Sequence, residues 1–260
     1  MLRPRIIPCL LVREKGLVKT LRFGEGKYVG DPINAVKIFN EKEVDELVVL
    51  DIDATARGHG PDYQMIEHFA AESRMPLCYG GGIKTAAEAK TIVGLGVEKV
   101  AISSAAVENP GLISEVADEV GRQSVVVVLD VKKKLLGAHY EVWTHNGTVN
   151  THKSPVQFAA ESEKLGAGEI VVNSIDNDGQ MKGYDFALAR QIRDATSLPM
   201  TVLGGAGSLQ DIGKLIAEFG VIGASAGSLF VFKGIYKAVL INYPGAAERD
   251  QLIRQSLGLA

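Results

Sequence analysis

Two glycine-rich segments of this chain repeat one plan, 124 positions apart, and each could bind a phosphate. One reads GGGIKTAAEAKTIVGLGVEKVAISSAA from Gly80, and the other reads GGAGSLQDIGKLIAEFGVIGASAGSLF from Gly204. In each copy a turn precedes an amphipathic helix, and a buried strand then leads into a small-residue turn that carries a serine, Ser104 or Ser228. Glycine lets the backbone approach an anion, and a helix N-terminus offers free N–H groups. The doubled unit predicts two anion sites in a repeated α/β architecture.

The elements that must position these sites are eight short apolar runs separated by helical patterns. Strands that alternate with helices predict a parallel sheet. Eight such units favour a closed (β/α)₈ TIM barrel over an open doubly wound sheet, and the repeat makes it two fused half-barrels. No linker divides the chain, so we expect a single domain over residues 1–260. The runs are RIIPCLLV, ELVVLDID, PLCYG, KVAIS, SVVVVLDV, EIVVNSID, PMTVLG and VIGAS.

Reactive groups of such barrels collect at the carboxyl ends of the strands. Two anion sites on opposite sides of that mouth predict an elongated substrate with a phosphate at each end. For a single glycine pair an ordinary turn is the alternative, whereas two matched copies favour binding. The predicted phosphate-binding residues are Gly81, Gly82, Ser103 and Ser104 at one site, and Asp178, Gly179, Gly205, Gly227 and Ser228 at the other.

Carboxylates also stand at predicted strand ends, at positions 51, 53, 130, 176 and 178. A buried carboxyl can act as a general acid or base once its surroundings tune its pKa. The catalytic candidates are Asp130, Asp176 and Lys19. Capping loops and orienting Lys19 is the alternative for Asp51 and Asp176.

No metal or cofactor is expected. The Asp176–Gly179 run lacks the bidentate Glu of a calcium loop. His139, His145 and His152 lie in a predicted polar loop without ligand spacing.

Four charged residues begin predicted strands at the opposite, N-terminal face: Arg5, Glu46, Lys99 and Glu169. Two are cations and two are anions. Ion pairs that close the bottom of the barrel are one explanation. A charged gate over a passage along the barrel axis is the other.

Composition indicates a globular protein with a large core, since 46% of residues are hydrophobic and 23% are charged. The net charge of −3 gives no support for a nucleic-acid surface. No apolar run is long enough for a membrane span or a signal peptide, so we expect a cytoplasmic protein without nucleic-acid or membrane partners.

Cys9 and Cys78 lie in strand-like runs and predict buried thiols, with a disulfide as the alternative.

Over essentially its full length the chain resembles the cyclase subunit of imidazole glycerol phosphate synthase from histidine biosynthesis. The matching motifs include RIIPCL, DELVVLDI, EKVAISSAAVENP, VVVVLDVK, GAGEIVVNSIDNDG and LGGAG. The resemblance implies a barrel that takes ammonia from a glutaminase docked on its N-terminal face and delivers it to a bis-phosphorylated substrate. It assigns the four N-terminal-face charges to an ammonia gate, and it makes Asp130 one of two catalytic aspartates.

The other catalytic aspartate is replaced in this chain. The first strand of the cyclases reads close to CLDV, whereas Cys9 here begins CLLV, and the repeat pairs Leu11 with Asp130. Leucine cannot transfer a proton, and losing one member of an acid/base pair costs on the order of 10²–10⁴ in rate. Ser103, Asn173 and Leu203 also stand where the cyclases usually have Asn, Thr and Ser.

The chain is also similar to cyclase-like proteins encoded with bacterial surface-polysaccharide genes, through CLL, GLVKT and YVGDPINAVKIFNEKEVDEL. This resemblance implies a synthase-type (lyase) subunit of a glutamine amidotransferase complex. It would deliver ammonia for converting an N-acetyl group of a nucleotide-linked sugar to an acetamidino group, beside a glutaminase and a separate sugar amidotransferase. This is the leading hypothesis. One alternative is a true cyclase that uses Asp130 with Asp176 or Asp178, and another is a non-catalytic scaffold that activates the glutaminase.

Overall fold

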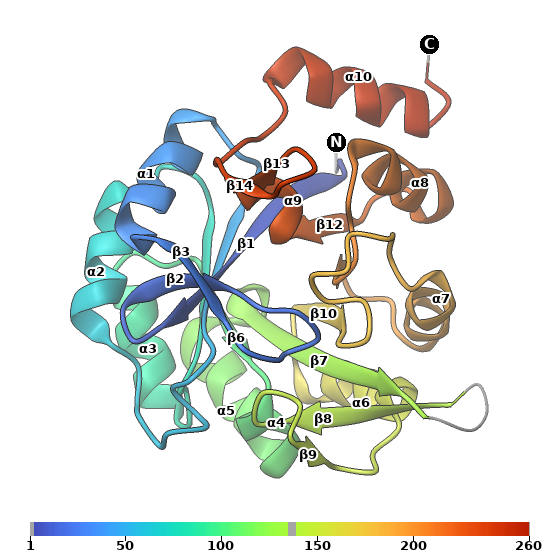
Figure 1. Cartoon of the computed structure of the whole chain (residues 1–260). Helices are drawn as coiled ribbons and strands as arrows, with labels where there is room; N and C mark the ends of the chain where they lie inside the picture. The colour runs from blue at the N-terminus through green and yellow to red at the C-terminus, as the bar shows by residue number, and fades with distance from the viewer. Residues whose placement is uncertain (1–2, 135–138, 260) are drawn as a thin grey trace.

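Eight parallel strands close into a ring in the computed structural model, which describes residues 3–134 and 139–259 (Figure 1). Seven neighbouring pairs follow the order of the chain, and the pairing of Ile6 with Ala224 closes the ring between the last strand and the first. The predicted (β/α)₈ barrel is confirmed. Its strands are β1 (Arg5–Arg13), β4 (Leu47–Asp51), β5 (Leu77–Gly80), β6 (Lys99–Ile102), β7 (Val125–Lys133), β10 (Glu169–Ser174), β11 (Met200–Leu203) and β12 (Gly223–Ala226).

Helices surround the ring because each presents one apolar face to the strands. In α1, for example, Val36 and Phe39 are buried one turn apart, and Ile66 and Phe69 are buried in α2. The helices are α1 (Pro32–Glu41), α2 (Tyr63–Glu72), α3 (Ala86–Gly94), α4 (Ser104–Glu108), α5 (Gly111–Val120), η1 (Arg122–Ser124), α6 (Pro155–Leu165), α7 (Phe186–Ala195), α8 (Leu209–Phe219), α9 (Ser228–Val231) and α10 (Ala246–Ser256).

The repeat seen in the sequence is present in the way the helices begin. Both α3 and α8 start with a capping box, formed by Thr85 with Glu88 and by Ser208 with Asp211. In each box the hydroxyl accepts a hydrogen bond from the backbone N–H three residues on, and the carboxylate accepts from the cap residue's own N–H. Two helices that follow glycine turns are therefore initiated in the same way in the two half-barrels.

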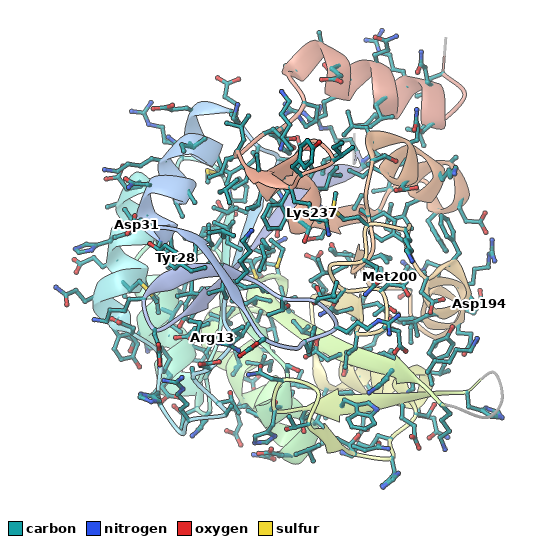
Figure 2. The ribbon with its side chains drawn as sticks, in the orientation of Figure 1. Arg13, Tyr28, Asp31, Asp194, Met200 and Lys237 are labelled. Carbon is teal, nitrogen blue, oxygen red and sulfur yellow. The ribbon has the colours of Figure 1, made fainter. Side chains whose placement is uncertain are left out.

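The interior of the ring holds a second, smaller apolar core separate from the one under the helices. Alternate residues of each strand point inward, so β1 contributes Ile7 and Cys9 to the interior and Ile6 and Leu10 to the outer core. Figure 2 shows side chains filling the space between strands and helices. Cys9 and Cys78 are buried free thiols, as predicted, and burial raises the pKa of the Cys9 thiol to about 12.

Two antiparallel hairpins extend the barrel strands at the mouth, and they were not predicted. β1 continues into β2 (Gly16–Lys19) and β3 (Lys27–Gly30), and β7 continues into β8 (Tyr140–Thr144) and β9 (Val149–Asn150) (Figure 1). We call residues 16–30 the first flap and residues 140–150 the second flap. His139, His145 and His152 lie in turns or coil, as predicted, but the region between them is not all polar loop, because Tyr140 and Val142 are buried in a strand against β7.

The chain ends outside the ring. A short hairpin, β13 (Phe232–Lys233) with β14 (Ala238–Val239), follows α9, and Tyr243 then donates a hydrogen bond to the carbonyl of Ile6 at 2.8 Å. This places α10 beside the start of β1 (Figure 1). Of the helices that the structure describes, none is both long and apolar enough to cross a bilayer.

Replacing Ile66 by Ala tests the outer core. Ile66 is fully buried in α2, and removing three carbons leaves a cavity that costs about 2–5 kcal/mol of unfolding free energy. Val221→Ala is the control, because Val221 is 53% exposed and its truncation should cost less than about 0.5 kcal/mol. Urea denaturation measures both. Equal midpoints for the two variants would contradict this account of the core.

Candidate active site at the barrel mouth

A pocket at the carboxyl ends of the strands brings together residues from both half-barrels. Every predicted catalytic and phosphate-binding residue lines it except Asp176. The predicted residues in the lining are Lys19, Gly81, Gly82, Ser103, Ser104, Asp130, Asp178, Gly179, Gly205, Gly227 and Ser228.

Asp130 is the carboxylate at the centre of this site. Its Oδ1 accepts a hydrogen bond from Asn173 Nδ2 at 2.9 Å, and its Oδ2 accepts one from the Ser103 hydroxyl at 3.2 Å. Burial raises the pKa of Asp130 to about 6, against the opposing effect of these two hydrogen bonds. A carboxyl that titrates near neutrality can both accept and donate a proton.

Asn173 carries an unsatisfied acceptor next to this carboxyl. Its side chain is 4% exposed, and its Oδ1 is buried without a hydrogen-bond partner. Leaving a buried acceptor unpaired costs about 1–3 kcal/mol. An N–H or O–H group of a bound molecule beside Asp130 would remove that cost, which makes Asn173 a candidate ligand-binding residue.

Leu11 occupies in β1 the position that Asp130 occupies in β7. Each is a partly exposed residue that follows five buried residues of its strand, and each is followed by a buried valine, Val12 or Val131. Leu11 packs against the apolar interior of the barrel. The mouth therefore has a carboxyl on one side and a hydrocarbon at the matching position on the other.

Lys19 places a buried positive charge beside the second predicted anion site. Its side chain is 5% exposed, and its Nζ donates to the Cys9 carbonyl at 2.7 Å. Burial lowers the pKa of Lys19 from its ordinary value. A Cβ atom at Gly227 would lie 2.6 Å from this Nζ, so the ammonium group sits directly against the turn that precedes Ser228.

Two glycines of the repeat have conformations that other residues rarely adopt. Gly81 has φ +130° and Gly205 has φ +110°. A Cβ at Gly81 would lie 2.5 Å from the Asp51 carbonyl oxygen, and one at Gly205 would collide with the Gly183 carbonyl. The equivalent turns of the two half-barrels therefore both require glycine, which supports a shared role for them in binding an anion.

The two serines of the first predicted anion site are already engaged within the protein. Ser103 donates to Asp130, and Ser104 Oγ accepts from the backbone N–H of His145 at 3.3 Å. An oxygen of Ser104 used as an acceptor leaves its O–H free to donate to a ligand.

The structure argues against the roles predicted for Asp176 and Asp178. Asp176 lies outside the pocket, where its Oδ2 accepts from the backbone N–H of Lys133 at 2.9 Å; this is the loop-capping alternative. Asp178 lines the pocket, but its carboxylate accepts from Thr20 Oγ1 at 2.8 Å and its N–H donates to Ser174 at 3.0 Å. Asp178 thus anchors the first flap and offers a phosphate no free donor. Burial raises the pKa of its carboxyl.

Asp51 also behaves as a cap. Its Oδ1 accepts from the backbone N–H groups of Asp53 and Ala54, both at 3.2 Å. Burial raises the pKa of Asp51 despite these bonds.

Two further pocket residues were not identified from the sequence. Arg13, labelled in Figure 2, lines the pocket two residues beyond Leu11 and pairs with Asp53 at 3.1 Å. The period of two along a strand could have found it. His145 reaches the pocket only because the second flap folds over, which its sequence did not reveal. Across the described ranges, no cluster of three or more His, Cys, Asp or Glu side chains could hold a metal ion.

The four charges of the opposite face form a closed ring. Arg5 pairs with both Glu46 and Glu169, the latter at 2.7 Å, and Lys99 lies 2.9 Å from a carboxylate oxygen of each glutamate. Both glutamates are buried. Burial acts to raise the pKa of Glu169, but Arg5 and Lys99 outweigh it and hold that pKa at about 2. We call these four residues the charged ring.

A (β/α)₈ barrel with a charged ring at one end and a polar, glycine-lined pocket at the other defines the general class of this protein. Residues 5–237 match the family described as histidine biosynthesis protein. The chain belongs to that family, and it fits the cyclase branch of imidazole glycerol phosphate synthase.

Close relatives agree with this placement. The chain is 58% identical over 253 residues to a Vibrio vulnificus protein provisionally named imidazole glycerol phosphate synthase subunit hisF3, covering 97% of each chain. It is 50% identical over 250 residues to one provisionally named subunit hisF2 in Pseudomonas aeruginosa, covering 96% and 99%. It is 39% identical over 232 residues to subunit HisF of Hyphomonas neptunium, covering 89% and 91%.

Asp130→Asn tests the environment of the central carboxyl. With a native pKa of about 6 against an ordinary value of 3.8, Asp130 keeps a proton between pH 4 and 6 that the unfolded chain releases. Its contribution to stability is therefore full below pH 4 and lost as pH rises through 6. The wild type should lose about 2–3 kcal/mol more than the variant between pH 4 and 7. Urea denaturation of both proteins across this pH range measures the difference. If the unfolding free energies of wild type and variant depend on pH in the same way, the raised pKa of Asp130 is refuted.

Proposed function

We propose that this barrel is the ammonia-receiving, synthase-type subunit of a glutamine amidotransferase complex, and that its nitrogen is used for a reaction other than imidazole ring closure. One observation carries the proposal: the charged ring is complete, while the position opposite Asp130 is Leu11. The charged ring, which suits the admission of ammonia, has all four residues. The acid/base pair that suits cyclisation has only Asp130.

The interior of the barrel supports a passage for a small neutral molecule. Between the ring and the mouth it is lined by aliphatic and thiol side chains such as Ile7, Val48 and Val171. An apolar lining disfavours ammonium relative to ammonia, because a buried charge without a partner is costly. A glutaminase docked on the N-terminal face would supply ammonia directly at the charged ring.

The mouth supports an anionic acceptor at the end of this passage. Lys19 and the glycine turns suit a phosphorylated group, and Asp130 with Asn173 offers acceptors for the arriving nitrogen. In the proposal the acceptor is the N-acetyl group of a nucleotide-linked sugar. A separate sugar amidotransferase would phosphorylate its carbonyl oxygen with a nucleoside triphosphate. Ammonia would then form the new carbon–nitrogen bond, the oxygen would leave as phosphate, and the nitrogen would lose its surplus protons to give the acetamidino group. Surface polysaccharide would be the product's destination.

Imidazole glycerol phosphate formation is the second candidate. Two observations favour it: the names of the relatives, and the presence in the pocket of Asp178, a second carboxyl whose pKa is raised. Asp178 would then have to leave Thr20 and act with Asp130 on a bis-phosphorylated ribulosyl substrate.

Complementation of a histidine auxotroph that lacks only its cyclase separates these candidates. The chain should give no growth, alone or with its glutaminase, because one member of the acid/base pair is missing. A functional cyclase gene is the positive control, and expression is verified by immunoblot. Growth supported by this chain would overturn the leading proposal and establish the second.

Glu169→Gln tests whether the charged ring serves ammonia delivery. The substitution removes one charge, so Arg5 and Lys99 lose a shared partner and the ring loosens. In the complex with glutaminase and acceptor, nitrogen delivered per glutamine hydrolysed should fall severalfold, while delivery from added ammonium persists. Glu161→Gln, at an exposed carboxylate of α6, is the matched control. An unchanged ratio would favour the scaffold alternative.

A further inference from the structure

One neutral side chain is hydrogen-bonded to the charged ring. Thr201, in β11, donates from its Oγ1 to Glu169 Oε1 at 2.6 Å. The two residues are 1% and 4% exposed, so water does not compete for this bond. Hydrogen bonds to a buried carboxylate are about twice as strong as neutral ones.

Space for this hydroxyl comes from a glycine on the next strand. Thr201 is in register with Gly223 of β12, which is itself in register with Arg5 of β1. A Cβ atom at Gly223 would collide with Thr201 Oγ1 and would lie 3.1 Å from Ile7 Cδ1. The hydroxyl therefore occupies the volume that any side chain at position 223 would need.

This bond makes the charged ring asymmetric. Among the residues that the structure describes, Glu46 receives side-chain hydrogen bonds only from Arg5 and Lys99, whereas Glu169 receives them from Arg5, Lys99 and Thr201. These donors to Glu46 are the ends of long side chains. Thr201 instead holds Glu169 from a short, β-branched side chain with few rotamers, fixed on a barrel strand.

We propose that Thr201 is a positioning residue of the charged ring: it fixes Glu169 as the static side, so that the ring opens by movement of Glu46 with Arg5 or Lys99. This rests on the proposed ammonia passage for its purpose. The positioning itself does not depend on that passage, and it can be measured in the isolated chain.

Carbon-13 NMR titration of the Glu169 carboxyl tests the positioning. Thr201→Val keeps the shape and removes the donor, so the pKa of Glu169 should rise by about one unit, a tenfold change in its protonation equilibrium. Thr201→Ser keeps the donor and should stay near wild type. Gly223→Ala should displace the hydroxyl and reproduce the Thr201→Val shift. An unchanged pKa in Thr201→Val, or equal shifts in the Ser and Val variants, would overturn the proposal.

Relaxation dispersion of the same carboxyl carbons tests which side moves. Exchange broadening is expected at Glu46 and not at Glu169 in the wild type, and at both in Thr201→Val. Broadening confined to Glu169 in the wild type would refute the asymmetry. Measuring the nitrogen delivered per glutamine in the Thr201→Val variant then separates the two proposals. If the pKa of Glu169 changes while this ratio stays at the wild-type value, Thr201 remains a positioning residue and the ammonia passage is rejected.

Discussion

Closure of eight parallel strands into one ring is the constraint on which the other features depend. Once β12 pairs with β1, every second side chain of each strand must point at a common axis. The residues at or just before the start of the strands then meet at one end. This is how Arg5, Glu46, Lys99 and Glu169 come into contact, although they lie far apart in the sequence. The residues at the other end meet around the pocket. Ring and pocket are thus two ends of one axis.

The duplication supplies both halves of the pocket, and it is preserved unevenly. Backbone features are retained, as in the paired turns at Gly81 and Gly205. The reactive side chains do not match in the same way, since Leu11 stands at the position equivalent to Asp130. Backbone geometry at a glycine turn is needed for the barrel to fold around its neighbours. Position 11 is partly exposed at the mouth, so leucine there is compatible with an intact fold.

The barrel and its ring could be predicted from sequence because their signals are strong and local. Buried apolar runs mark parallel strands, and a charge at the start of such a run can only lie near the rim, as Lys99 does. The flaps could not, because their strands pair antiparallel with the ends of β1 and β7 and interrupt the strand–helix alternation on which the prediction rests. Asp176 and Asp178 follow the end of β10, where a turn replaces the strand, so their directions cannot be read from alternation. The contact of Thr201 with Glu169 depends on the register of neighbouring strands, which a single sequence does not specify.

The flaps give the mouth a property that neither half-barrel has alone. Thr20 and Arg22 tie the first flap to Asp178 in the other half, and a Cβ at Gly147 of the second flap would lie 3.2 Å from Phe23 Cδ2. The two tips therefore pack against each other. Phe23 of the first flap and His145 and Asn146 of the second also line the pocket. In mechanical terms the two half-barrels are therefore linked above the site, and a displacement of one tip must disturb the packing of the other.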